Sequence, residues 1–596
     1  MDNMCQIPKF NIWDKSISRY ITKKYKNKKC VKTYENNYYT LNNGLLKLNS
    51  STLENSTCFY ACIYPIGDNS LTKGKYEKIV NPVILDCDTF HIYCRKPNIT
   101  IFEDLNFHIR SINFNNQVSS NVSKINQNFV ESSKKYNVHI FVIDSLSYYQ
   151  AKRGFEKSRN LFREKYQSIE FPFLNRVADN SRPNAYSFLM NKNSLNIIDI
   201  FGTKRTIIND WKNDDPCNVP LNDTTYIINQ YKKMGYITMN AENYWYGGVF
   251  NWNNCKSFTK QQADHTLRTF QLANRVISYK LVDRITRERC FGHGNYLFEY
   301  LKQFSERYKD KPHLSLVWES NAVHNDINGI MDFDNYFENF FSENINLFKN
   351  SFMFVMSDHG FRLGSFQDTQ IGKFEADNPY LMISVPIELR NNKQLLKTLK
   401  ENSNKHISHF DVYATLLDIL TEASKTNFEN LKEFDLSSIV NFKVKGKSML
   451  RPLQIKNRSC YELYVPLENC LCQFNFTKKY FISNKEQNSL KYAFLDEINK
   501  NIINNNLTNI CAKRSLNNNY KFNIGKAYLK NETPVYEVKG HVLPGDGIFS
   551  GFFNGDFQLI NNELLRINSY RSESESCLYE GKNSKYCFCK KLIKQD

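Results

Sequence analysis

The segment Phe352-Met353-Phe354-Val355-Met356-Ser357-Asp358-His359-Gly360 decides the fold class of this chain. Its five leading apolar residues predict a strand that is buried on both faces, as in a parallel sheet covered by helices. Asp358 and His359 follow the strand directly, and the carboxyl ends of parallel strands are where α/β sheets place their binding sites. A carboxylate beside an imidazole offers two ligand atoms to one divalent metal ion.

Two more apolar segments end in side chains that bind metals. Residues 138–143 are followed by Asp144, and residues 314–318 are followed by a polar stretch that contains Glu319 and His324. For a single Asp, a helix cap or a turn is the simpler interpretation. Because the ends of parallel strands share one edge of a sheet, we expect these groups to meet although they lie far apart in the chain.

Strand and helix patterns alternate from residue 131 to residue 450. We expect further parallel strands at 236–239 and 380–385, and helices at 224–234, ended by Gly235, and at 296–308. This alternation predicts an α/β domain over 131–450, with a doubly wound, mostly parallel sheet and helices on both faces. Residues 1–130 are expected to form an irregular, mostly β region packed on the core, and residues 451–596 a cysteine-rich region with little regular structure.

Length and charge limit the possible partners. The chain has 596 residues, too many for one compact core, and no apolar run approaches the roughly 20 residues of a membrane helix. The net charge is +19, but the basic residues are scattered and no nucleic-acid-binding motif accompanies them, so we expect no nucleic-acid partner. The densest basic run, residues 23–29, is interpreted as a solvated face; an acidic glycan or an anionic lipid surface is the alternative.

Most of the 16 cysteines lie in the two flanking regions. An even number clustered in irregular ends predicts disulfides, and therefore an extracellular or secretory-lumen location. A zinc cluster at the pairs Cys470/Cys472 and Cys587/Cys589 is the alternative, although their one-residue spacing is shorter than zinc sites use. The first five residues show no signal peptide, so either export uses a segment outside this chain or the cysteines are reduced.

Sites for N-linked glycosylation agree with export. The sequons are at Asn49, Asn55, Asn98, Asn121, Asn222, Asn457, Asn475, Asn506 and Asn531.

The segment Ser181-Arg182-Pro183-Asn184 supplies a candidate nucleophile. Pro183 suits the first turn of a helix that runs to about residue 190, and a plain N-cap role for Ser181 is the simpler interpretation. A helix N-terminus also offers free amides and positive potential to an anion, which is where a hydroxyl that accepts a phosphoryl group should lie. Asn184 would donate a hydrogen bond to the same group.

In this order, these motifs resemble the alkaline phosphatase superfamily, especially its nucleotide phosphodiesterase and sulfatase-like branches. More closely, the chain resembles an animal sulfatase-like family of extracellular proteins of unknown function, and the likeness spans most of its length. The closer likeness rests on residues 358–364, 372–375, 378–379, 410–416, 446–448 and 457–460. The cysteines at 5, 470 and 472 also resemble the disulfide-bearing flanks of that family.

The resemblance implies a two-metal site, with zinc as the expected metal. One ion would be bound by Asp144, Asp358, His359 and the Ser181 oxygen, and the other by His324 and one further histidine. His409 is our choice for that histidine, His406 is the alternative, and a structural role at a helix terminus is the third interpretation. The resemblance also implies in-line displacement by Ser181 and a phosphoseryl intermediate that water hydrolyses.

Two departures from the superfamily pattern matter. An aspartate normally stands four residues before the His324 position, but this chain has Ser320 there, with Glu319 beside it and Asp326 after it. The ligands of the second ion are therefore open. The sulfatase signature requires an arginine where this chain has Ala185, which argues against a formylglycine sulfatase.

For three other residues the sequence gives less support for a functional role. Glu242 and Lys373 are candidate substrate contacts, although surface acids and lysines are common. His139 lies inside the first predicted strand and is interpreted as a core histidine.

The leading hypothesis is a metal-dependent phosphoric-ester hydrolase, a monoesterase or diesterase, that acts on a small molecule, glycan or lipid head group carrying an anionic ester. The alternative is a catalytically degenerate extracellular binding or structural protein on the same scaffold, which Ser320 and the cysteine-rich flanks favour. A third hypothesis is an anionic-glycan binder that uses the lysines at 23–29.

Overall fold

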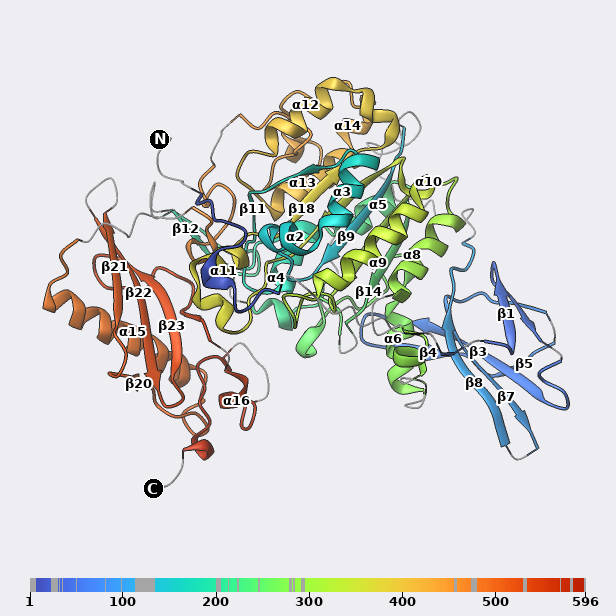
Figure 1. Ribbon diagram of the computed structural model, residues 1–596, viewed down its shortest axis with the longest axis horizontal. Helices are drawn as coiled ribbons and strands as arrows, with labels where there is room; N and C mark the ends of the chain where they lie inside the picture. Colours follow the sequence, from blue (N-terminus) through green and yellow to red (C-terminus); the bar gives the residue numbers. More distant parts are fainter. Residues whose placement is uncertain are drawn as a thin grey trace.

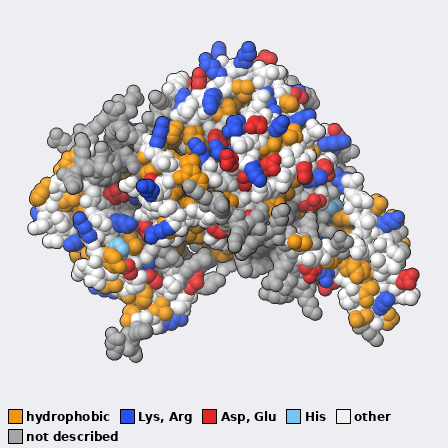
Figure 2. Space-filling view, viewed as in Figure 1, with side chains coloured by type: hydrophobic (Ala, Val, Ile, Leu, Met, Phe, Trp, Pro, Cys, Tyr) orange, Lys and Arg blue, Asp and Glu red, His pale blue; other side chains and the backbone are white. Residues whose placement is uncertain are grey.

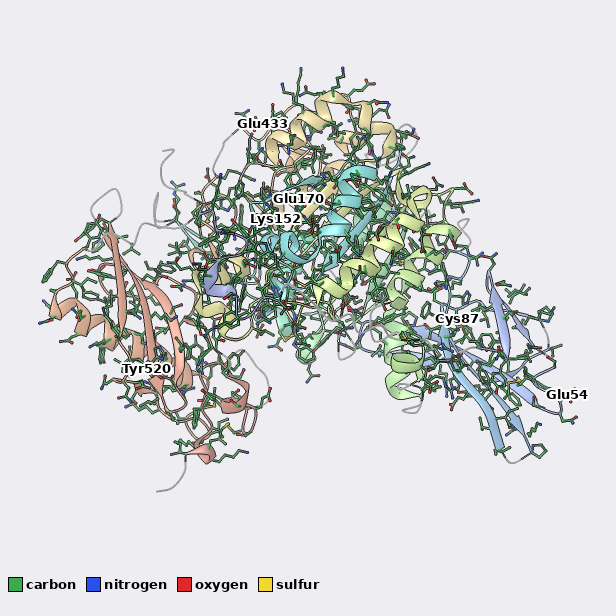
Figure 3. The ribbon with its side chains drawn as sticks, viewed as in Figure 1. Glu54, Cys87, Lys152, Glu170, Glu433 and Tyr520 are labelled. Atoms are coloured by element: carbon green, nitrogen blue, oxygen red, sulfur yellow. A yellow bond between two sulfur atoms is a disulfide. The ribbon has the colours of Figure 1, made fainter. Side chains whose placement is uncertain are left out.

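The computed structural model describes residues 7–593, apart from 23–30, 32, 35, 50, 81, 98, 113–133, 200–204, 213, 222–224, 245–246, 278–280, 282–283, 291–294, 455–457, 473–479, 529–532, 569 and 579–582. An α/β core lies between a β-rich N-terminal part, at the right of Figure 1, and a C-terminal part with helix α15, at the left. Figure 3 labels Cys87 on the first and Tyr520 on the second. The basic run at 23–29 lies outside the described residues, as do Cys5, Asn98, Asn121, Asn222, Asn457, Asn475 and Asn531.

Seven strands form the central sheet, in the order β10-β18-β17-β9-β16-β14-β15. In chain order they are β9 (Asn137–Ile143), β10 (Ile169–Glu170), β14 (Ile237–Glu242), β15 (His265–Thr266), β16 (His313–Glu319), β17 (Ser351–Met356) and β18 (Leu381–Ser384). β9 lies in the middle, with β16 and β17 as parallel neighbours, and β14 and β15 continue the parallel run beyond β16. The sheet is mostly parallel, as predicted.

Helices cover both faces of this sheet, so the fold is doubly wound as predicted (Figure 1). One face carries α2 (Tyr148–Gly154), α3 (Glu156–Lys165), α6 (Arg268–Val276), α8 (Asn295–Arg307), α9 (Ile330–Glu343) and α10 (Ile345–Phe348). The other carries α4 (Ser181–Met190), α5 (Ile227–Lys233), α12 (Lys393–Asn402), α13 (His409–Leu420) and α14 (Glu422–Lys425).

β9 supplies side chains to both hydrophobic cores. Val138, Ile140 and Val142 belong to the core beneath α4 and α13, whereas Phe141 and Ile143 belong to the core beneath α8 and α9. Because successive side chains of a strand point to opposite faces, an apolar run of this length has to be covered on both sides.

The direction of β18 differs from the prediction. The apolar segment 380–385 was expected to be a parallel strand, but β18 pairs antiparallel with β17, with Phe354 opposite Ile383. Apolar composition reports burial on both faces and carries no information about strand direction. A short connection decides the direction here, because α11 (Gln370–Asp377) returns the chain beside β17.

The N-terminal part is built from two antiparallel sheets. One has the order β1-β2-β6, from Tyr39–Asn42, Leu45–Leu48 and Val83–Ile84. The other has the order β4-β3-β7-β8, from Leu71–Lys73, Thr57–Pro65, Thr89–Lys96 and Ile99–Phe107, with β5 (Glu77–Lys78) also paired to β3. The mostly β character predicted for this part is present in its described residues.

The C-terminal part is more regular than its sequence indicated. It contains α15 (Asn484–Asn504) and a five-stranded sheet from Ser515–Leu516, Asn523–Tyr528, Pro534–Leu543, Gly547–Phe553 and Leu565–Arg566. The helix buries a single narrow stripe against that sheet: Leu490, Phe494, Ile498 and Ile502. One apolar residue per turn in an Asn- and Lys-rich segment is too weak a pattern to be recognised as an amphipathic helix.

Disulfides link the described cysteines, so the predicted disulfide framework is confirmed and the zinc-cluster alternative is wrong. None of the described cysteines is free. Six pairs are defined: Cys58–Cys94, Cys62–Cys87, Cys217–Cys255, Cys460–Cys470, Cys511–Cys587 and Cys577–Cys589. Cys470 and Cys587, from the two close cysteine pairs, each bond to a cysteine elsewhere in the chain.

Several sequon residues and many charged side chains lie at the surface of the described structure. The sequon residues Asn49, Asn55 and Asn506, which the structure describes, are exposed. Acidic and basic side chains are intermixed on the face of the core in Figure 2. Among the described residues, no helix is both long and apolar enough to cross a membrane.

Gly360, directly after the Asp358-His359 pair, allows a close approach between two backbone segments. A Cβ atom at this position would lie 1.8 Å from the Glu375 carbonyl oxygen, and the Gly360 amide donates to the Ala376 carbonyl at 3.0 Å. We expect Gly360→Ala to lower the free energy of unfolding by about 2 kcal/mol, the usual cost of overpacking. Chemical denaturation measures this change.

Gly364→Ala is the comparison for that experiment. Gly364 has φ +67°, but a Cβ atom there meets no atom within 4 Å, so only the backbone cost of about 1 kcal/mol applies. Equal midpoints for the wild type and Gly360→Ala would contradict the close approach.

Candidate metal centre and nucleophile

Asp144, Asp358 and His359 meet at one edge of the central sheet. β9 delivers Asp144, and its parallel neighbour β17 delivers Asp358 and His359. One ligand atom from each residue lies within 4.8 Å of the others. His359 Nε2 is 3.4 Å from Asp358 Oδ2 and 3.9 Å from Asp144 Oδ1. Two of the three strand ends predicted to meet, those of β9 and β17, therefore supply one group of ligands, and we call Asp144, Asp358 and His359 the Asp-Asp-His cluster.

The orientation of Asp358 leaves one carboxylate oxygen free. Its Oδ1 accepts hydrogen bonds from the backbone amides of Ser145, at 3.1 Å, and His359, at 2.9 Å. Ser145 has φ +66°, a conformation that costs a non-glycine residue energy and is often found at functional sites. Asp358 Oδ2 is buried and has no hydrogen-bond partner in the described part of the chain. Such a buried, unpaired carboxylate oxygen is costly unless a cation binds it.

The hydrogen bonds of His359 define its tautomer. Its Nδ1 lies 2.9 Å from the Gly360 carbonyl oxygen, which only accepts hydrogen bonds, so Nδ1 carries the proton. Nε2 is then the nitrogen with a lone pair, and it faces the two carboxylates. Burial also lowers the pKa of His359 to about 4, so the ring is neutral at pH 7. Neutral imidazole with its second nitrogen held by a carbonyl is the usual form of a metal ligand.

The charges of the cluster residues also favour the binding of a cation. Burial, followed by the negative charge of Asp358, raises the pKa of Asp144 to about 7, while the positive charges of His324 and Arg362 act in the opposite direction. Two carboxylates so close together in a buried place repel each other. The residues present therefore fit one divalent metal ion, held by Asp144, Asp358 and His359.

Ser181 lies beside this cluster at the N-terminus of α4. Its Oγ is 3.3 Å from His359 Nε2 and 3.5 Å from Asp144 Oδ2. The N-cap of α4 is Asn180, not Ser181, and the Asn180 side chain makes no capping hydrogen bond. The simpler interpretation of Ser181 as a cap is therefore wrong. Its hydroxyl faces the Asp-Asp-His cluster, with the positive end of the helix behind it.

The amide of Asn184 has a different role from the one predicted. Asn184 is fully buried, and its Oδ1 accepts hydrogen bonds from the backbone amides of Val177, at 2.9 Å, and Ala178, at 3.2 Å. Its Nδ2 donates to the carbonyls of Ala178 and Asn180, at 2.7 and 2.8 Å. Because the backbone uses both of its donors, Asn184 holds the loop that leads into α4, and this corrects the expectation that it donates to a substrate.

His409 and His406 lie outside the cluster. His409 Nε2 is 3.0 Å from the Ser357 carbonyl, so this nitrogen donates to the loop behind Asp358, and the ring packs on Phe188. His406 bonds through Nε2 to Asn175 Oδ1, at 3.0 Å, and through Nδ1 to the Arg458 carbonyl. The structure thus favours the helix-terminal structural interpretation of His409. His139, buried and bonded to Ser315 Oγ at 2.7 Å, is a core histidine as predicted.

The residues considered for a second metal ion, around His324, do not form a cluster like that of Asp144, Asp358 and His359. Both carboxylate oxygens of Glu319 are occupied, by the amides of Asn321 and Ala322 and by Asn243 Nδ2. Asp326 is exposed and accepts from the backbone of the following turn, at Asn328. His324 is partly exposed, and its Nδ1 lies 2.9 Å from Asn325 Oδ1. The described residues form no second ligand group around it.

The two weaker candidates lie elsewhere. Lys373 pairs with Glu537 of the C-terminal sheet at 2.9 Å. Glu242 Oε2 accepts from the Val249 amide at 2.7 Å and lines a small cavity with Asp68 and Arg268. Neither contact places the side chain at the Asp-Asp-His cluster.

Sequence reasoning missed the ion pairs that support the cluster. The side chains of Arg153 and Glu375 are completely buried and pair at 2.5 Å, and Ser147 Oγ bonds to the same carboxylate at 2.6 Å. Arg176 pairs with Asp377 at 2.8 Å. These partners are distant in sequence, so no local charge pattern could indicate them.

The doubly wound, mostly parallel sheet, with Asp144, Ser181, Asp358 and His359 close together at one edge, agrees with the resemblance to the alkaline phosphatase superfamily seen in the sequence. A family model described as "Protein of unknown function (DUF229)" matches residues 16–520. The chain belongs to this family, which agrees with the closer resemblance seen in the sequence. No curated protein matches the chain.

The solved structures that match the chain share little of its sequence. The C-terminal periplasmic domain of EptC from Escherichia coli is 13% identical, over 55% of this chain and 90% of that one, with a TM-score of 0.35. The lipoteichoic acid synthase LtaP from Listeria monocytogenes is 10% identical, over 55% and 78%, with a TM-score of 0.32. An alkaline phosphatase superfamily protein from Vibrio parahaemolyticus is 13% identical, over 77% and 86%, with a TM-score of 0.31.

Proposed function

We propose that the chain is a metal-dependent hydrolase of phosphate esters in which Ser181 is the nucleophile. One observation carries the proposal: the Ser181 hydroxyl lies at a helix N-terminus, 3.3 Å from the unprotonated nitrogen of His359, beside a buried and unpaired Asp358 oxygen. A nucleophile, an anion-binding helix end and a metal-competent cluster in one place are the parts that phosphoryl transfer requires.

The donor set supports one ion rather than the two zinc ions expected at first. Asp144, Asp358 and His359 would hold it, with Ser181 Oγ as a further ligand. Two carboxylates and an imidazole are donors that zinc and manganese accept. When bound, the ion would supply positive charge to the phosphoryl oxygens and to the Ser181 oxygen.

The residues of the chain position the reaction. Ser181 Oγ donates toward Asp144 Oδ2, which leaves an oxygen lone pair for attack on phosphorus. The Oγ–P bond forms as the bond from phosphorus to the ester oxygen breaks, and the released alcohol takes up a proton. Water then attacks the phosphoserine, so phosphate leaves and Ser181 regains its proton. The N-terminus of α4 stabilises the negative charge throughout.

The nature of the nucleophile favours phosphate esters over sulfate esters as substrates. Ser181 is an unmodified hydroxyl here, and Ala185 replaces the arginine of the sulfatase signature, so no aldehyde nucleophile is expected. The disulfides support an oxidising compartment, and substrates would meet the enzyme in the secretory lumen or outside the cell.

Trapping the intermediate tests the proposal. Metal-loaded protein is mixed with 4-nitrophenyl phosphate or 4-nitrophenyl sulfate and quenched in acid, and its peptides are analysed by mass spectrometry. We expect one phosphoryl group on the peptide containing Ser181 and no sulfated peptide, because the serine ester is stable in acid. Ser187→Ala, on the same helix, is the control and should still be labelled.

A folded, metal-loaded sample that neither turns over the ester nor forms phosphoserine would contradict the proposal. That result would favour a degenerate binding protein, which the engaged carboxylate of Glu319 and the missing aspartate at Ser320 motivate.

A further inference from the structure

One face of the sheet β4-β3-β7-β8 packs on the core at one end and continues beyond it. At the packed end, Phe107 of β8 meets Phe270 of α6, with ring centroids 5.1 Å apart, and Ile63 and Leu105 are buried in the same hydrophobic core. The strands β3, β7 and β8 then extend past α6 (Figure 1). Because alternate residues of a strand share a face, the face that carries Ile63 and Leu105 continues along these strands, away from the core.

Three aromatic rings lie together on this extension. The pairing of β3 with β7 places Phe59 opposite Tyr93, and their rings stack with centroids 5.3 Å apart. The ring of Tyr76 meets Tyr93 edge-on at 5.0 Å, and its hydroxyl lies 2.9 Å from Nδ1 of the buried His91. Phe59, Tyr76 and Tyr93 are only half-buried. These contacts hold three partly exposed rings in defined positions.

Three cations border the rings. The guanidinium carbon of Arg95 lies over the Phe59 ring, 5.2 Å from its centroid, and Lys73 Nζ lies over the Tyr76 ring at 4.7 Å. Lys78 stands opposite Phe59 in the pairing of β5 with β3. All three cationic side chains are exposed, and none of them forms an ion pair within the part of the chain that the structure describes. We call Phe59, Lys73, Tyr76, Lys78, Tyr93 and Arg95 the ring-and-cation face.

The acids that lie beside these rings do not neutralise the cations. Glu103 is opposite Tyr93 in β8, but its Oε1 is 3.1 Å from His91 Nε2. Glu77 accepts a hydrogen bond at 2.9 Å from Tyr60, which alternates with Phe59 and so belongs to the other face of the sheet. Solvated surface lysines are the simpler interpretation of such charges. That interpretation does not account for two of the three cations lying over aromatic rings.

The chemistry of this face fits a chain of sugar rings that carries negative charges. Lysine and arginine form strong, charge-assisted hydrogen bonds with sulfate and carboxylate groups. A cation held over an aromatic ring keeps its charge and loses less freedom when a ligand binds. Tyrosine offers an apolar ring and a polar edge together, which matches the C–H faces and hydroxyl groups of a sugar.

Two other kinds of polyanion fit less well. Single-stranded nucleic acids stack their bases on open ring faces, but Tyr93 and Arg95 already lie against the ring of Phe59. A lipid surface requires apolar side chains that project into it, whereas these rings pack against one another. The disulfides Cys58–Cys94 and Cys62–Cys87 lie in this part of the chain and favour an oxidising compartment, where acidic glycans are available.

We infer that the ring-and-cation face binds an acidic glycan, a polysaccharide that carries sulfate or carboxylate groups. The binding is independent of the proposed hydrolase, because the Asp-Asp-His cluster takes its residues from β9 and β17. The face would hold the protein on such a glycan while the site at the central sheet stays free.

Binding of a heparin octasaccharide to the full chain, followed by calorimetry in about 0.15 M salt, tests the inference. We expect Lys73→Gln/Arg95→Gln to weaken binding about tenfold, because two charge contacts are lost. Phe59→Leu keeps every charge but removes the ring beneath Arg95, so it should weaken binding about threefold.

Lys47→Gln/Lys165→Gln is the matched control. It also removes two exposed lysines, but from β2 and α3, outside the ring-and-cation face. Its affinity for the octasaccharide should equal that of the wild type. The basic run at 23–29 is present in every protein and contributes equally to each. Thermal unfolding of Lys73→Gln/Arg95→Gln and of Phe59→Leu should match the wild type.

Equal losses of affinity in the two double variants would overturn the inference, because net charge alone would then explain the binding. A wild type that does not bind the octasaccharide would also overturn it, as would unchanged affinity in a folded Phe59→Leu. Oligodeoxythymidine and phosphatidylserine vesicles serve as the other polyanions. If Lys73→Gln/Arg95→Gln weakens binding to either of these but not to heparin, the ligand is not a glycan and the inference is wrong.

Discussion

Ser181→Ala should reduce kcat for 4-nitrophenyl phosphate about 10⁴-fold, because the attacking oxygen is removed while the rest of the site remains. The Oγ atom lies 3.3 Å from His359 Nε2 and 3.5 Å from Asp144 Oδ2, and no other hydroxyl of the described residues contacts both of these atoms. Steady-state kinetics of the metal-loaded variant measure the change. The expected residual rate comes from the helix N-terminus and the bound ion acting on water.

The control for this experiment is Ser187→Ala in the same helix. Ser187 is buried and its Oγ bonds to the Asn184 carbonyl at 2.5 Å, away from the cluster, so kcat should stay within threefold of the wild type. Unchanged turnover in a pure Ser181→Ala sample would show that another group, or water directly, attacks the ester.

Asp358→Asn should weaken zinc binding about 100-fold or more. The substitution keeps Oδ1 as the acceptor for the Ser145 and His359 amides, but it replaces the unpaired Oδ2 by an amide group that cannot bind a cation. One negative charge of the cluster is lost as well. Calorimetric titration of the metal-free protein with zinc gives the two affinities.

The zinc affinity of Asp326→Asn shows whether the ion binds at the Asp-Asp-His cluster or around His324. Asp326 is an exposed carboxylate close to His324 in sequence, so its removal should change zinc affinity less than twofold if one ion is bound at the Asp-Asp-His cluster. A large loss in Asp326→Asn, with a small loss in Asp358→Asn, would mean that the metal binds around His324.

Much of the core could be predicted because strands that are buried on both faces require mostly apolar residues. Within residues 138–143, 314–318 and 352–356, which became most of β9, β16 and β17, only His139 and Ser315 are polar. The carboxyl ends of these runs are marked by Asp144, Glu319 and Asp358. Parallel geometry then requires those ends to share an edge. The meeting of distant strand ends was therefore a consequence of topology and needed no knowledge of contacts.

The remaining features depend on contacts that a linear pattern does not contain. The direction of β18 is set by a connection, and the helix α15 shows only four buried apolar residues. Asn184 and His409 have the residue types of functional groups, but their hydrogen bonds go to backbone atoms of adjacent loops. Only coordinates distinguish a polar side chain that positions a loop from one that meets a ligand.

The place of β9 in the middle of the sheet has a consequence for motion. Because β9 is paired on both sides and contributes to both hydrophobic cores, its amides should exchange with solvent only through global unfolding. Asp144 is attached to the end of this strand, so the anchoring half of the metal site moves with the most rigid part of the molecule. We therefore expect substrate to enter without movement of β9 or of the Asp144 carboxylate at its end.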